Sequence, residues 1–358
     1  MKVLVIGDPH FKTSNVKETD EMVESILKIA KEVLPKFIVI LGDVLDRHEL
    51  IHVSPFVRAN KFIFSLSELS KVYLLIGNHD LKNNRQFLSD EHPFYSLKDF
   101  ENIVVVDKVI CETIDNRIFT MVPYVPPGMF IKALNTCQIL SEISNATSNE
   151  ISANVISNEI SNDSIWHKSD LIFAHQEFRG CKMGAIISEE GDEWNMNYPP
   201  VISGHIHNYQ ELGNIVYVGT PIQHGYDDSI DKTISLLEFN ENKNFIHKRI
   251  DLNCRKKKII RISVADVSTY EADDKYDLRI YISGSPGEIK GIMKHPNISK
   301  WKSKGISIKF KDIAIGGVKE KTEKTREIMP YLQMIQEAIA NHENAMQWYK
   351  ELILKQNN

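Results

Sequence analysis

The sequence predicts an α/β domain over residues 1–252, a small α+β domain over 253–315, and a linker with a helical tail over 316–358. Short apolar runs such as VLVIG, FIVILGD and VYLLIGNHD alternate with two longer amphipathic segments in the first 76 residues. Apolar strands that alternate with helices are typical of a sheet covered on both faces. A length of 358 residues, 42% of them hydrophobic and 25% charged, fits one large globular domain with one or two small ones.

The elements of the large domain follow from the spacing of its apolar residues. Helical periodicity predicts helices over residues 16–34 and 54–69, between the first three strands. Further strand-like runs are NIVVVD, RIFTMVPYV, LIFAHQ, PPVISGHIH, NIVYVGTP and TISLLEF, with fewer helices between them. Residues 141–164 contain seven Ser and five Asn, so we expect an insertion or a short surface helix there, without a chemical role.

The last hundred residues differ in character from the large domain. DLRIYIS and GISIKFKDI predict strands, and GSPGEIKGIMKHPNISKW predicts a broken helical segment between them. After Gly316 and Gly317 the chain is charged and helical, with a break at Pro330. An apolar stripe on this tail consists of Leu332, Ile335, Ile339, Met346, Tyr349 and Ile353. The stripe fits packing on the chain's own core or docking on a partner coiled coil, and its place after a linker favours the partner.

Several classes of protein are disfavoured by the composition. No apolar run approaches the ~20 residues of a membrane span, and the run after Met1 lacks the cleavage site of a signal peptide. The four cysteines lack CxxC spacing, which argues against a disulfide framework or a zinc knot. We therefore expect an intracellular protein, in the cytoplasm or nucleoid. A net charge of −5 means that any binding of nucleic acid relies on a local basic patch or on metal ions.

Five short motifs place metal-binding side chains at the ends of predicted strands. GDPH, GDVLDRH and GNHD follow the first three apolar runs, and AHQ and SGHIH follow two later ones. In GDPH, Asp8 and His10 are two residues apart, which in an extended chain puts them on one side. Because open α/β sheets place their sites at the carboxyl ends of strands, we expect these groups to face one crevice. The predicted ligands are Asp8, His10, Asp43, Asn78, His175, His205 and His207.

This ligand set predicts two transition-metal ions and phosphate ester hydrolysis. Carboxylates, imidazoles and one amide oxygen suit Mn, Fe or Zn, and the set is too rich in histidine for calcium. Two ions ~3.5–4 Å apart need a bridging carboxylate, and such a pair clamps a phosphate for in-line displacement. Apart from these four ligand histidines and His79 of GNHD, eight histidines remain, including His48, His52 and His224, and they are assigned to surface or supporting positions.

In order and spacing, GDPH, GDVLD, GNHD, AHQ and GHIH resemble the calcineurin-like metallophosphoesterase superfamily over roughly residues 1–240. The resemblance implies a two-sheet αββα sandwich. The YVGTP stretch, the small α+β unit and the helical tail are similar to SbcD-type nucleases, called meiotic-recombination-eleven nucleases in eukaryotes. The short tail looks most like the phage and viral versions.

The superfamily pattern also implies a role for each motif residue. It implies two metal sites that share Asp43, one formed by Asp8, His10 and His207, the other by Asn78, His175 and His205. His79 is implied to lie over the scissile phosphate, where it stabilises the transition state or protonates the leaving oxygen, and Asp46 to orient that ring with its carboxylate. The alternation of side chains along an extended segment agrees with these different roles, because the adjacent Asn78 and His79 then point to opposite sides. Asp80 is then a structural neighbour.

The resemblance also implies an activity, its metal ions and its partners. It implies an endonuclease and 3′-to-5′ exonuclease that acts on DNA ends in recombination or repair with two Mn²⁺, for which Fe, Zn or Mg substitute. It also implies a homodimer, a capping domain that shapes DNA access, and an SMC-like ATPase of the SbcC or Rad-fifty type bound by the C-terminal helices.

Two alternatives stay open beside the nuclease. Arg47 follows Asp46 as in the GDxxDR motif of protein phosphatases, where such an arginine contacts phosphate, so a phosphatase or cyclic-nucleotide phosphodiesterase is the second hypothesis. A scaffold protein without catalytic activity is disfavoured, because every predicted ligand position carries a residue that can bind metal. The basic run that includes Arg255, Lys256 and Lys257 is either a contact with DNA phosphates or a solvated connection.

Overall fold

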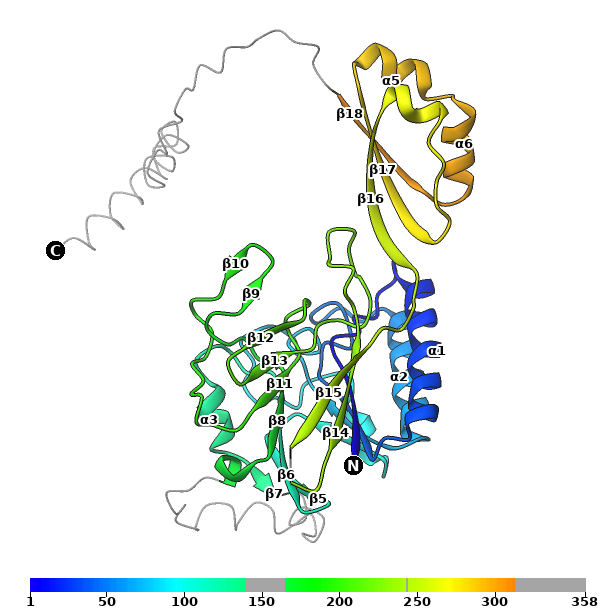
Figure 1. Ribbon diagram of the computed structural model, residues 1–358. Helices are drawn as coiled ribbons and strands as arrows, with labels where there is room; N and C mark the ends of the chain where they lie inside the picture. The colour runs from blue at the N-terminus through cyan, green and yellow to red at the C-terminus, as the bar shows by residue number, and fades with distance from the viewer. Residues whose placement is uncertain (140–164, 243, 313–358) are drawn as a thin grey trace, which may run out of the picture.

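The computed structural model describes residues 1–139, 165–242 and 244–312. The predicted insertion at 141–164 and the apolar stripe from Leu332 to Ile353 lie outside the described residues. Two large sheets form the first 250 residues, and a smaller sheet follows them (Figure 1). Within the described part of the chain, no helix is both long enough and apolar enough to cross a membrane.

The first sheet carries the N-terminal motifs. Its strand order is β15-β14-β1-β2-β3-β4. The bounds are β1 (Lys2–Ile6), β2 (Phe37–Ile40), β3 (Lys71–Leu75), β4 (Ile103–Val106), β14 (Ile234–Phe239) and β15 (Phe245–Ile250). Strands β1 to β4 are parallel and are connected by α1 (Val16–Val33), α2 (Val53–Ser67) and the 3₁₀ helix η1 (Tyr95–Asp99). Parallel pairing brings the carboxyl ends of β1, β2 and β3 to one edge.

The second sheet has shorter strands in the order β12-β13-β11-β8-β6-β5-β7. They are β5 (Ile110–Ile114), β6 (Arg117–Val122), β7 (Gln138–Ile139), β8 (Leu171–Ala174), β11 (Val201–Ser203), β12 (Gln210–Leu212) and β13 (Ile215–Tyr217). Helices α3 (Phe130–Leu134) and η2 (Ile165–Lys168) accompany this sheet, and β9 (Lys182–Met183) and β10 (Ile186–Ile187) form a separate hairpin. Strands β8 and β11, which carry the later motifs, are parallel neighbours.

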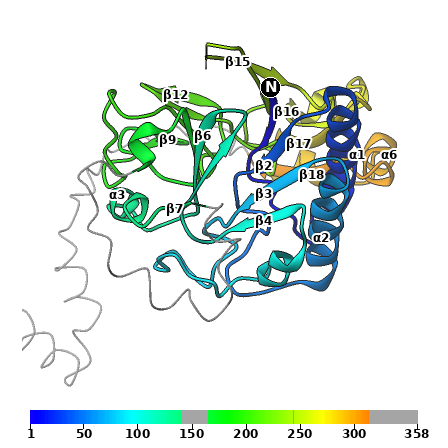
Figure 2. The ribbon, with the colours of Figure 1, turned by 90° about the horizontal axis from the view of Figure 1, so that it is seen from below.

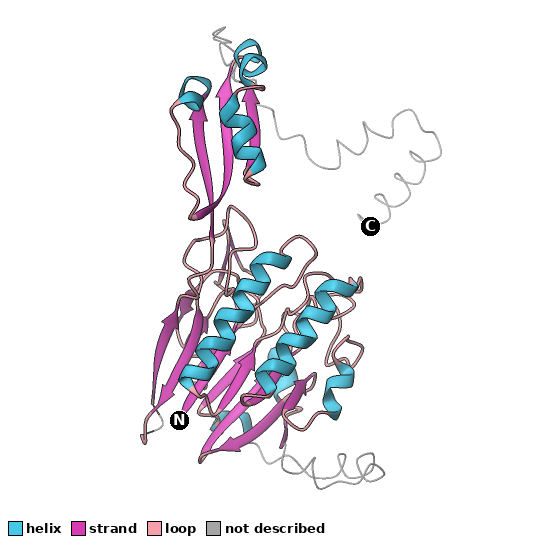
Figure 3. Ribbon diagram, turned by 90° about the vertical axis from the view of Figure 1, so that its right-hand side faces the viewer, coloured by secondary structure: helices cyan, strands magenta, loops and turns pink. Residues whose placement is uncertain are grey.

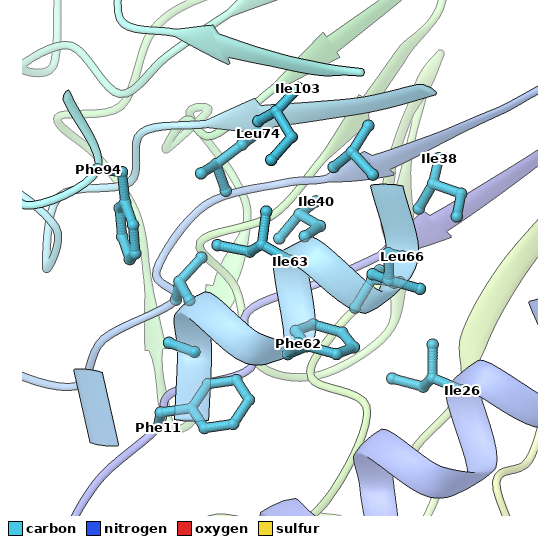
Figure 4. Packing of buried hydrophobic residues seen from close by; sticks show 14 of the residues in the cluster. Phe11, Ile26, Ile38, Ile40, Phe62, Ile63, Leu66, Leu74, Phe94 and Ile103 are labelled. Atoms are coloured by element: carbon cyan, nitrogen blue, oxygen red, sulfur yellow. The ribbon is translucent and has the colours of Figure 1, made fainter. Parts of the chain in front are cut away.

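Alternating side chains of the first sheet build two separate cores. Val5 packs between the sheets with Phe119 and Phe173, whereas the next residue, Ile6, belongs to the core under the helices with Phe62 of α2. Figure 4 shows the helix-side packing, and Figures 2 and 3 show α1 and α2 over the outer face of the first sheet. A third cluster covers the outer face of the second sheet with α3 and η2. This layering confirms the predicted αββα sandwich.

The small sheet follows directly from the large domain. Its three parallel strands lie in the order β16-β17-β18. The elements are β16 (Lys256–Ser263), η3 (Val264–Ser268), β17 (Tyr276–Gly284), α5 (Pro286–Ile292), α6 (Pro296–Ser303) and β18 (Ser307–Asp312). Ile280 and Trp301 are part of its own apolar core. Figure 1 shows this sheet beyond the end of the sandwich opposite the N-terminus, which is the end where β1 to β3 finish.

Candidate metal centre

The loops after five strands meet at one end of the sandwich. Three belong to the first sheet, after β1, β2 and β3, and two belong to the second, after β8 and β11. The side chains that they bring together are those of Asp8, His10, Asp43, Asn78, His175, His205 and His207. All but the last two are buried. The structure therefore assembles every group that the sequence predicts as a metal ligand.

Four of these ligand atoms form one cluster. Asn78 Oδ1 lies 3.0 Å from both His175 Nε2 and His205 Nδ1. His175 Nε2 lies 3.3 Å from His205 Nδ1 and 3.4 Å from Asp43 Oδ1. One ligand atom each from Asp43, His175 and His205 lies within 4.8 Å of the others, a spacing that can hold a metal ion. The four atoms supply the mixed nitrogen and oxygen set that Mn, Fe or Zn accepts.

A second cluster lies on the other side of Asp43. His10 Nε2 is 3.0 Å from His207 Nε2 and 3.7 Å from Asp43 Oδ2. Two ring nitrogens at this separation match adjacent ligands of one ion with bonds of about 2.1 Å. Asp8 Oδ2 is buried without a hydrogen-bond partner among the described residues, and an unpaired buried carboxylate oxygen favours a cation. Because Asp43 directs one oxygen to each cluster, the residues fit a bridged pair of ions.

The protonation of the histidines also fits metal binding. His175 Nδ1 donates to the Leu41 carbonyl at 2.7 Å, so Nε2 is the nitrogen that faces the cluster. Burial alone lowers the pKa of His175, but the carboxylates of Asp43 and Asp8 outweigh it and raise that pKa to about 9. A cation takes the place of that proton. Burial lowers the pKa of His205 to about 3 and that of His10 well below its ordinary value, which leaves neutral rings with free lone pairs.

The backbone at the ligands is turned, not extended. The φ angles of His10, Asp43 and His205 are 45°, 47° and 78°, in the left-handed region that residues with a side chain seldom adopt. The prediction of an extended chain from Asp8 to His10 is therefore wrong, although both side chains reach the site. Such strain is held in place by surrounding contacts and is typical of functional sites.

Residues 1–209 match the family of calcineurin-like phosphoesterases. The chain belongs to this family. Its members hydrolyse phosphate esters at a dinuclear metal centre, so a metal-dependent phosphoester hydrolase is the activity of this fold and site.

Three relatives of this calcineurin-like phosphoesterase extend the comparison. Protein 078R of Invertebrate iridescent virus 3, which is named as a phosphoesterase, is 37% identical over 316 residues. These residues cover 87% of this chain and 84% of that protein. Protein 244L of Invertebrate iridescent virus 6, which is also named as a phosphoesterase, is 39% identical over 301 residues. These residues cover 82% of this chain and 98% of that protein. Exonuclease subunit 1 of Enterobacteria phage T4 is 24% identical over 270 residues, 70% of each chain.

His79 of this phosphoesterase lies beside the clusters without joining either. Its Nδ1 is 2.8 Å from the main-chain carbonyl of Asp46, and its Nε2 is 4.0 Å from Asp43 Oδ2. The side chain is 34% exposed, so a substrate can reach it. The expected contact from the Asp46 carboxylate is corrected here, because that carboxylate accepts from Lys12 Nζ at 3.2 Å instead. The ring of His48 stacks on His79 with centroids 4.7 Å apart, a contact that sequence reasoning missed.

Asp80 ties two ligand loops together. Its buried carboxylate accepts from the main-chain nitrogens of Val44, Leu45 and Gly77 at 2.9 to 3.2 Å. Burial and the charge of Asp43 raise the pKa of Asp80 to about 7. These contacts fix the loop after β2 against the loop after β3, which is the structural role that the sequence predicts for this residue.

His224 is a neighbour of the centre, in the supporting position that was one of the two alternatives given for it from the sequence. Its ring centroid lies 4.9 Å from that of His10 and 5.8 Å from that of His207, and its Nε2 lies 3.3 Å from the carbonyl oxygen of Asp8. Burial and the charge of Lys12 lower the pKa of His224 to about 3. The available signal was its position, since it follows β13 in the segment VGTPIQHG, as the other motif residues follow their strands.

The basic run that was expected to contact substrate forms contacts within the protein. Lys257 is 7% exposed, and its Nζ lies 3.1 Å from Glu18 Oε1 at the start of α1. Lys256 Nζ lies 2.6 Å from Asp251, and Arg255 donates to a main-chain carbonyl of β17. The expectation that Lys257 contacts DNA is corrected, because its charge is buried against the large domain.

Arg47 is better placed for a substrate. It lines two cavities on either side of the Asp46 loop, one with Lys12 and the other with His79. Because Arg47 and His79 line one cavity, a phosphate group bound in that cavity could contact the guanidinium.

Proposed function

We propose that this chain is a DNA nuclease that uses two Mn²⁺ to hydrolyse phosphodiester bonds as a 3′-to-5′ exonuclease and an endonuclease. The family accounts for phosphoester hydrolysis, and the nature of the substrate is the proposed part. The observation that carries the proposal is the charge of the small sheet beside the metal centre. The roles that we propose are the processing of DNA ends in recombination and repair.

The small sheet is basic although the whole chain is acidic. Residues 256–312 contain 13 Lys and Arg and seven Asp and Glu, a net charge of +6, whereas the chain as a whole carries −5. This sheet lies at the end of the sandwich that carries the metal ligands (Figure 1). A basic surface next to a phosphoesterase centre suits a polyanion, whose affinity comes largely from phosphate contacts. The name of the phage relative, an exonuclease subunit, supports the same substrate.

The residues around the centre have separable tasks in this reaction. When bound, a pair of divalent cations supplies Lewis-acid activation of water and neutralises charge on the phosphate. His79 Nδ1 donates to the Asp46 carbonyl, so a second proton on Nε2 makes the ring a cation that donates to a phosphate or leaving oxygen. A positioned proton donor of this kind contributes about 10²- to 10⁴-fold in rate. Arg47 adds a second cation on the solvent side.

Partners are also part of the proposal. We propose that an SMC-like ATPase of the SbcC or Rad-fifty type binds the tail residues from Leu332 to Ile353, and that the protein acts as a homodimer. The support is the apolar stripe in the sequence of the tail, together with the word subunit in the name of the phage relative.

A phosphatase or cyclic-nucleotide phosphodiesterase is the second candidate. The observation that favours it is Arg47, which lines a cavity with His79 as a phosphate-binding arginine would. A small substrate would not contact a basic sheet outside the pocket, so this sheet favours the nuclease over the second candidate.

The deciding experiment compares substrates at one centre. We expect Mn²⁺-dependent cleavage of end-labelled linear DNA and of closed circular DNA, increased or redirected by the ATPase with ATP. Phosphopeptides and cyclic nucleotides serve as competing substrates, and faster turnover of either would favour the second candidate. Absence of cleavage of any DNA, with or without the ATPase, would reject the nuclease.

A charge-reversal pair tests the carrying observation directly. Lys309 and Lys311 are exposed on β18, and their change to Glu should slow DNA cleavage more than cleavage of a small phosphodiester. Lys28 and Lys31 are exposed near the end of α1, away from the metal ligands, and the same change there is the matched control. Equal effects of the two pairs on DNA cleavage would contradict the role of the small sheet.

A further inference from the structure

A cavity of about 250 Å³ is lined by the loop after β1 and the loop after β2. The first loop contributes Lys12, Thr13 and Ser14, and the second contributes Asp46 and Arg47. Pockets that bind drug-sized molecules have volumes of about 300 to 1,000 Å³. This cavity is smaller, so it suits a small group such as one phosphate.

The lining of this cavity carries an excess of positive charge. Its charged residues are two cations, Lys12 and Arg47, and one anion, Asp46. With histidines counted as neutral, the neighbouring cavity that shares Arg47 is lined by two cations and three anions, and the one that shares Lys12 by three of each. Because positive charge attracts anions, the cavity between Lys12 and Arg47 is the one of these three that favours an anionic ligand.

The donor groups around this cavity are accessible to a ligand. Arg47, Thr13 and Ser14 are exposed, and their side chains have no hydrogen-bond or ion-pair partner among the described residues. The Lys12 side chain is 23% exposed, and its Nζ donates to Asp46 Oδ1 at 3.2 Å, which leaves two of its three N–H groups for a ligand. A guanidinium, an ammonium and two hydroxyl groups around one small space suit a phosphate.

Asp46 places this cavity next to the metal centre. The oxygen that accepts from Lys12, Asp46 Oδ1, also lies 3.8 Å from Nδ1 of the metal ligand His10. Arg47 lines a second cavity together with His79, the ring that is proposed to act on the scissile phosphate. A phosphate bound between Lys12 and Arg47 is therefore a neighbour of a phosphate at the metals, as two successive phosphates of one nucleic acid strand are.

We propose that the cavity between Lys12 and Arg47 binds the phosphate next to the scissile one in a DNA strand. The inference rests on the proposed nuclease function, and it adds a subsite by which the protein distinguishes a polynucleotide from a phosphate monoester or a cyclic nucleotide. Those small substrates carry one phosphate, which the metal centre takes. In an exonuclease that starts at a 3′ end, the phosphate in this subsite is the second linkage from that end.

The test removes one negative charge at a time from the DNA. Linear strands of one sequence carry a single methylphosphonate, in which a methyl group replaces a charged oxygen, at the second or at the fifth linkage from the 3′ end. The first linkage is unmodified, and its hydrolysis is timed with Mn²⁺. We expect the change at the second linkage to slow this step about tenfold or more, the order of a hydrogen bond to a charged group, and the change at the fifth linkage to slow it less.

Replacement of either cation should weaken this preference. In Lys12→Met and in Arg47→Gln the second phosphate loses one partner, so the ratio of the unmodified rate to the rate with the second linkage changed should fall by about threefold or more. Lys12→Arg keeps the charge and should retain most of the ratio. Lys28→Met changes an exposed lysine near the end of α1, and as the matched control it should keep the wild-type ratio. Metal content and thermal unfolding show whether each variant is folded.

Binding without turnover gives a second measurement. A strand whose first linkage has a methylene group in place of the 3′-oxygen is not hydrolysed, so its Kd can be measured with Mn²⁺ present. The slope of log Kd against log salt concentration reports the phosphates in contact, at about 0.7 to 0.9 for each. Lys12→Met and Arg47→Gln should lower this slope, and Lys28→Met should leave it unchanged.

The outcomes separate the inference from the function on which it rests. The subsite is rejected if DNA is cleaved but the change at the second linkage costs no more than the change at the fifth. It is also rejected if the ratio is unchanged in folded Lys12→Met or in folded Arg47→Gln, and in both cases the nuclease stands. Failure to cleave any DNA, linear or closed circular, overturns both.

Discussion

At the scale of single residues, His79 and the ligands around it have different tasks although they lie within a few ångströms. The His79 main-chain nitrogen donates to Asp43 Oδ1 at 2.8 Å, while its ring is turned to the Asp46 carbonyl and the solvent side. We expect His79→Ala to bind both metals and to lose about 10²- to 10⁴-fold in phosphodiester turnover. Elemental analysis and kcat on one preparation measure the two effects.

Asp43→Ala is the comparison for that variant. Because Asp43 directs one oxygen to each cluster, its removal should lower the metal content of both sites. A preparation of His79→Ala that lacks one metal would show that the ring is a ligand and contradict its assigned role.

Gly204 is a second residue whose replacement has a defined effect. A Cβ atom at this position would lie 2.5 Å from Asp8 Oδ1 and 3.0 Å from His175 Nδ1, which is too close for both groups to stay in place. Gly204→Ala should lower the thermal midpoint and the metal content together. Gly287→Ala is the matched control, because its Cβ would meet nothing within 4 Å, and it should leave both unchanged. Similar behaviour of the two variants would exclude the steric explanation.

The same residues show what the sequence could and could not predict about the site. The ligand positions were predictable, because each follows an apolar strand and parallel strands end at one edge. The turned backbone at His10 and His205 was not, since it depends on contacts with other loops. The contact of His79 with a main-chain oxygen of Asp46 was equally hidden, because a motif names side chains only.

At the scale of elements, Asp107 links the end of β4 to the segment that contains η1. Its buried carboxylate accepts from Lys98 Nζ at 2.5 Å and His92 Nε2 at 3.3 Å. Burial alone raises the pKa of Asp107, but His92 and Lys98 outweigh it and lower that pKa below the ordinary value. A lowered folded pKa stabilises the native state above the unfolded pKa of about 3.9, and this contribution is lost as the pH falls through the folded value.

Asp107→Asn should therefore cost stability at neutral pH and less in acid. We expect a loss of about 1.5 to 3 kcal/mol at pH 7, the range for hydrogen bonds to charged groups, and a smaller loss at pH 3. Urea unfolding of both proteins at the two pH values measures the difference. An equal loss at pH 7 and pH 3 would mean that the charge of Asp107 contributes nothing.

The start of β16 shows why this strand was interpreted as a connection in the sequence. Three lysines in a row hide the strand period, so the basic run reads as a connection in the sequence KKKIIRIS. In the structure Lys257 points inward to Glu18 while Lys258 is exposed, which is the alternation of a strand. The pairing joins residues 239 positions apart, and no local pattern encodes such a partner.

At the scale of the whole molecule, the metal ligands join the two sheets of the sandwich. Asp8, His10, Asp43 and Asn78 come from the first sheet, and the remaining three histidines come from loops of the second. The layered fold was predictable from strand and helix alternation together with the motif order. The strand order of the second sheet was not, because its strands are short and pair across long separations in sequence.

A metal pair that bridges two sheets should stabilise the fold as well as serve catalysis. An ion that binds only the native state adds about 2.7 kcal/mol at a hundredfold excess over its Kd, so a pair adds about 5.4 kcal/mol, which is about 11 to 22 °C for a domain of this size. We expect chelation with EDTA to lower the thermal midpoint by that amount and added Mn²⁺ to restore it. Asp43→Ala should melt near the chelated wild type and respond to neither reagent, because its clusters lack their shared ligand. If the wild type melts at the same temperature with and without chelator, the ions do not join the sheets, and the clusters hold their geometry through protein contacts alone.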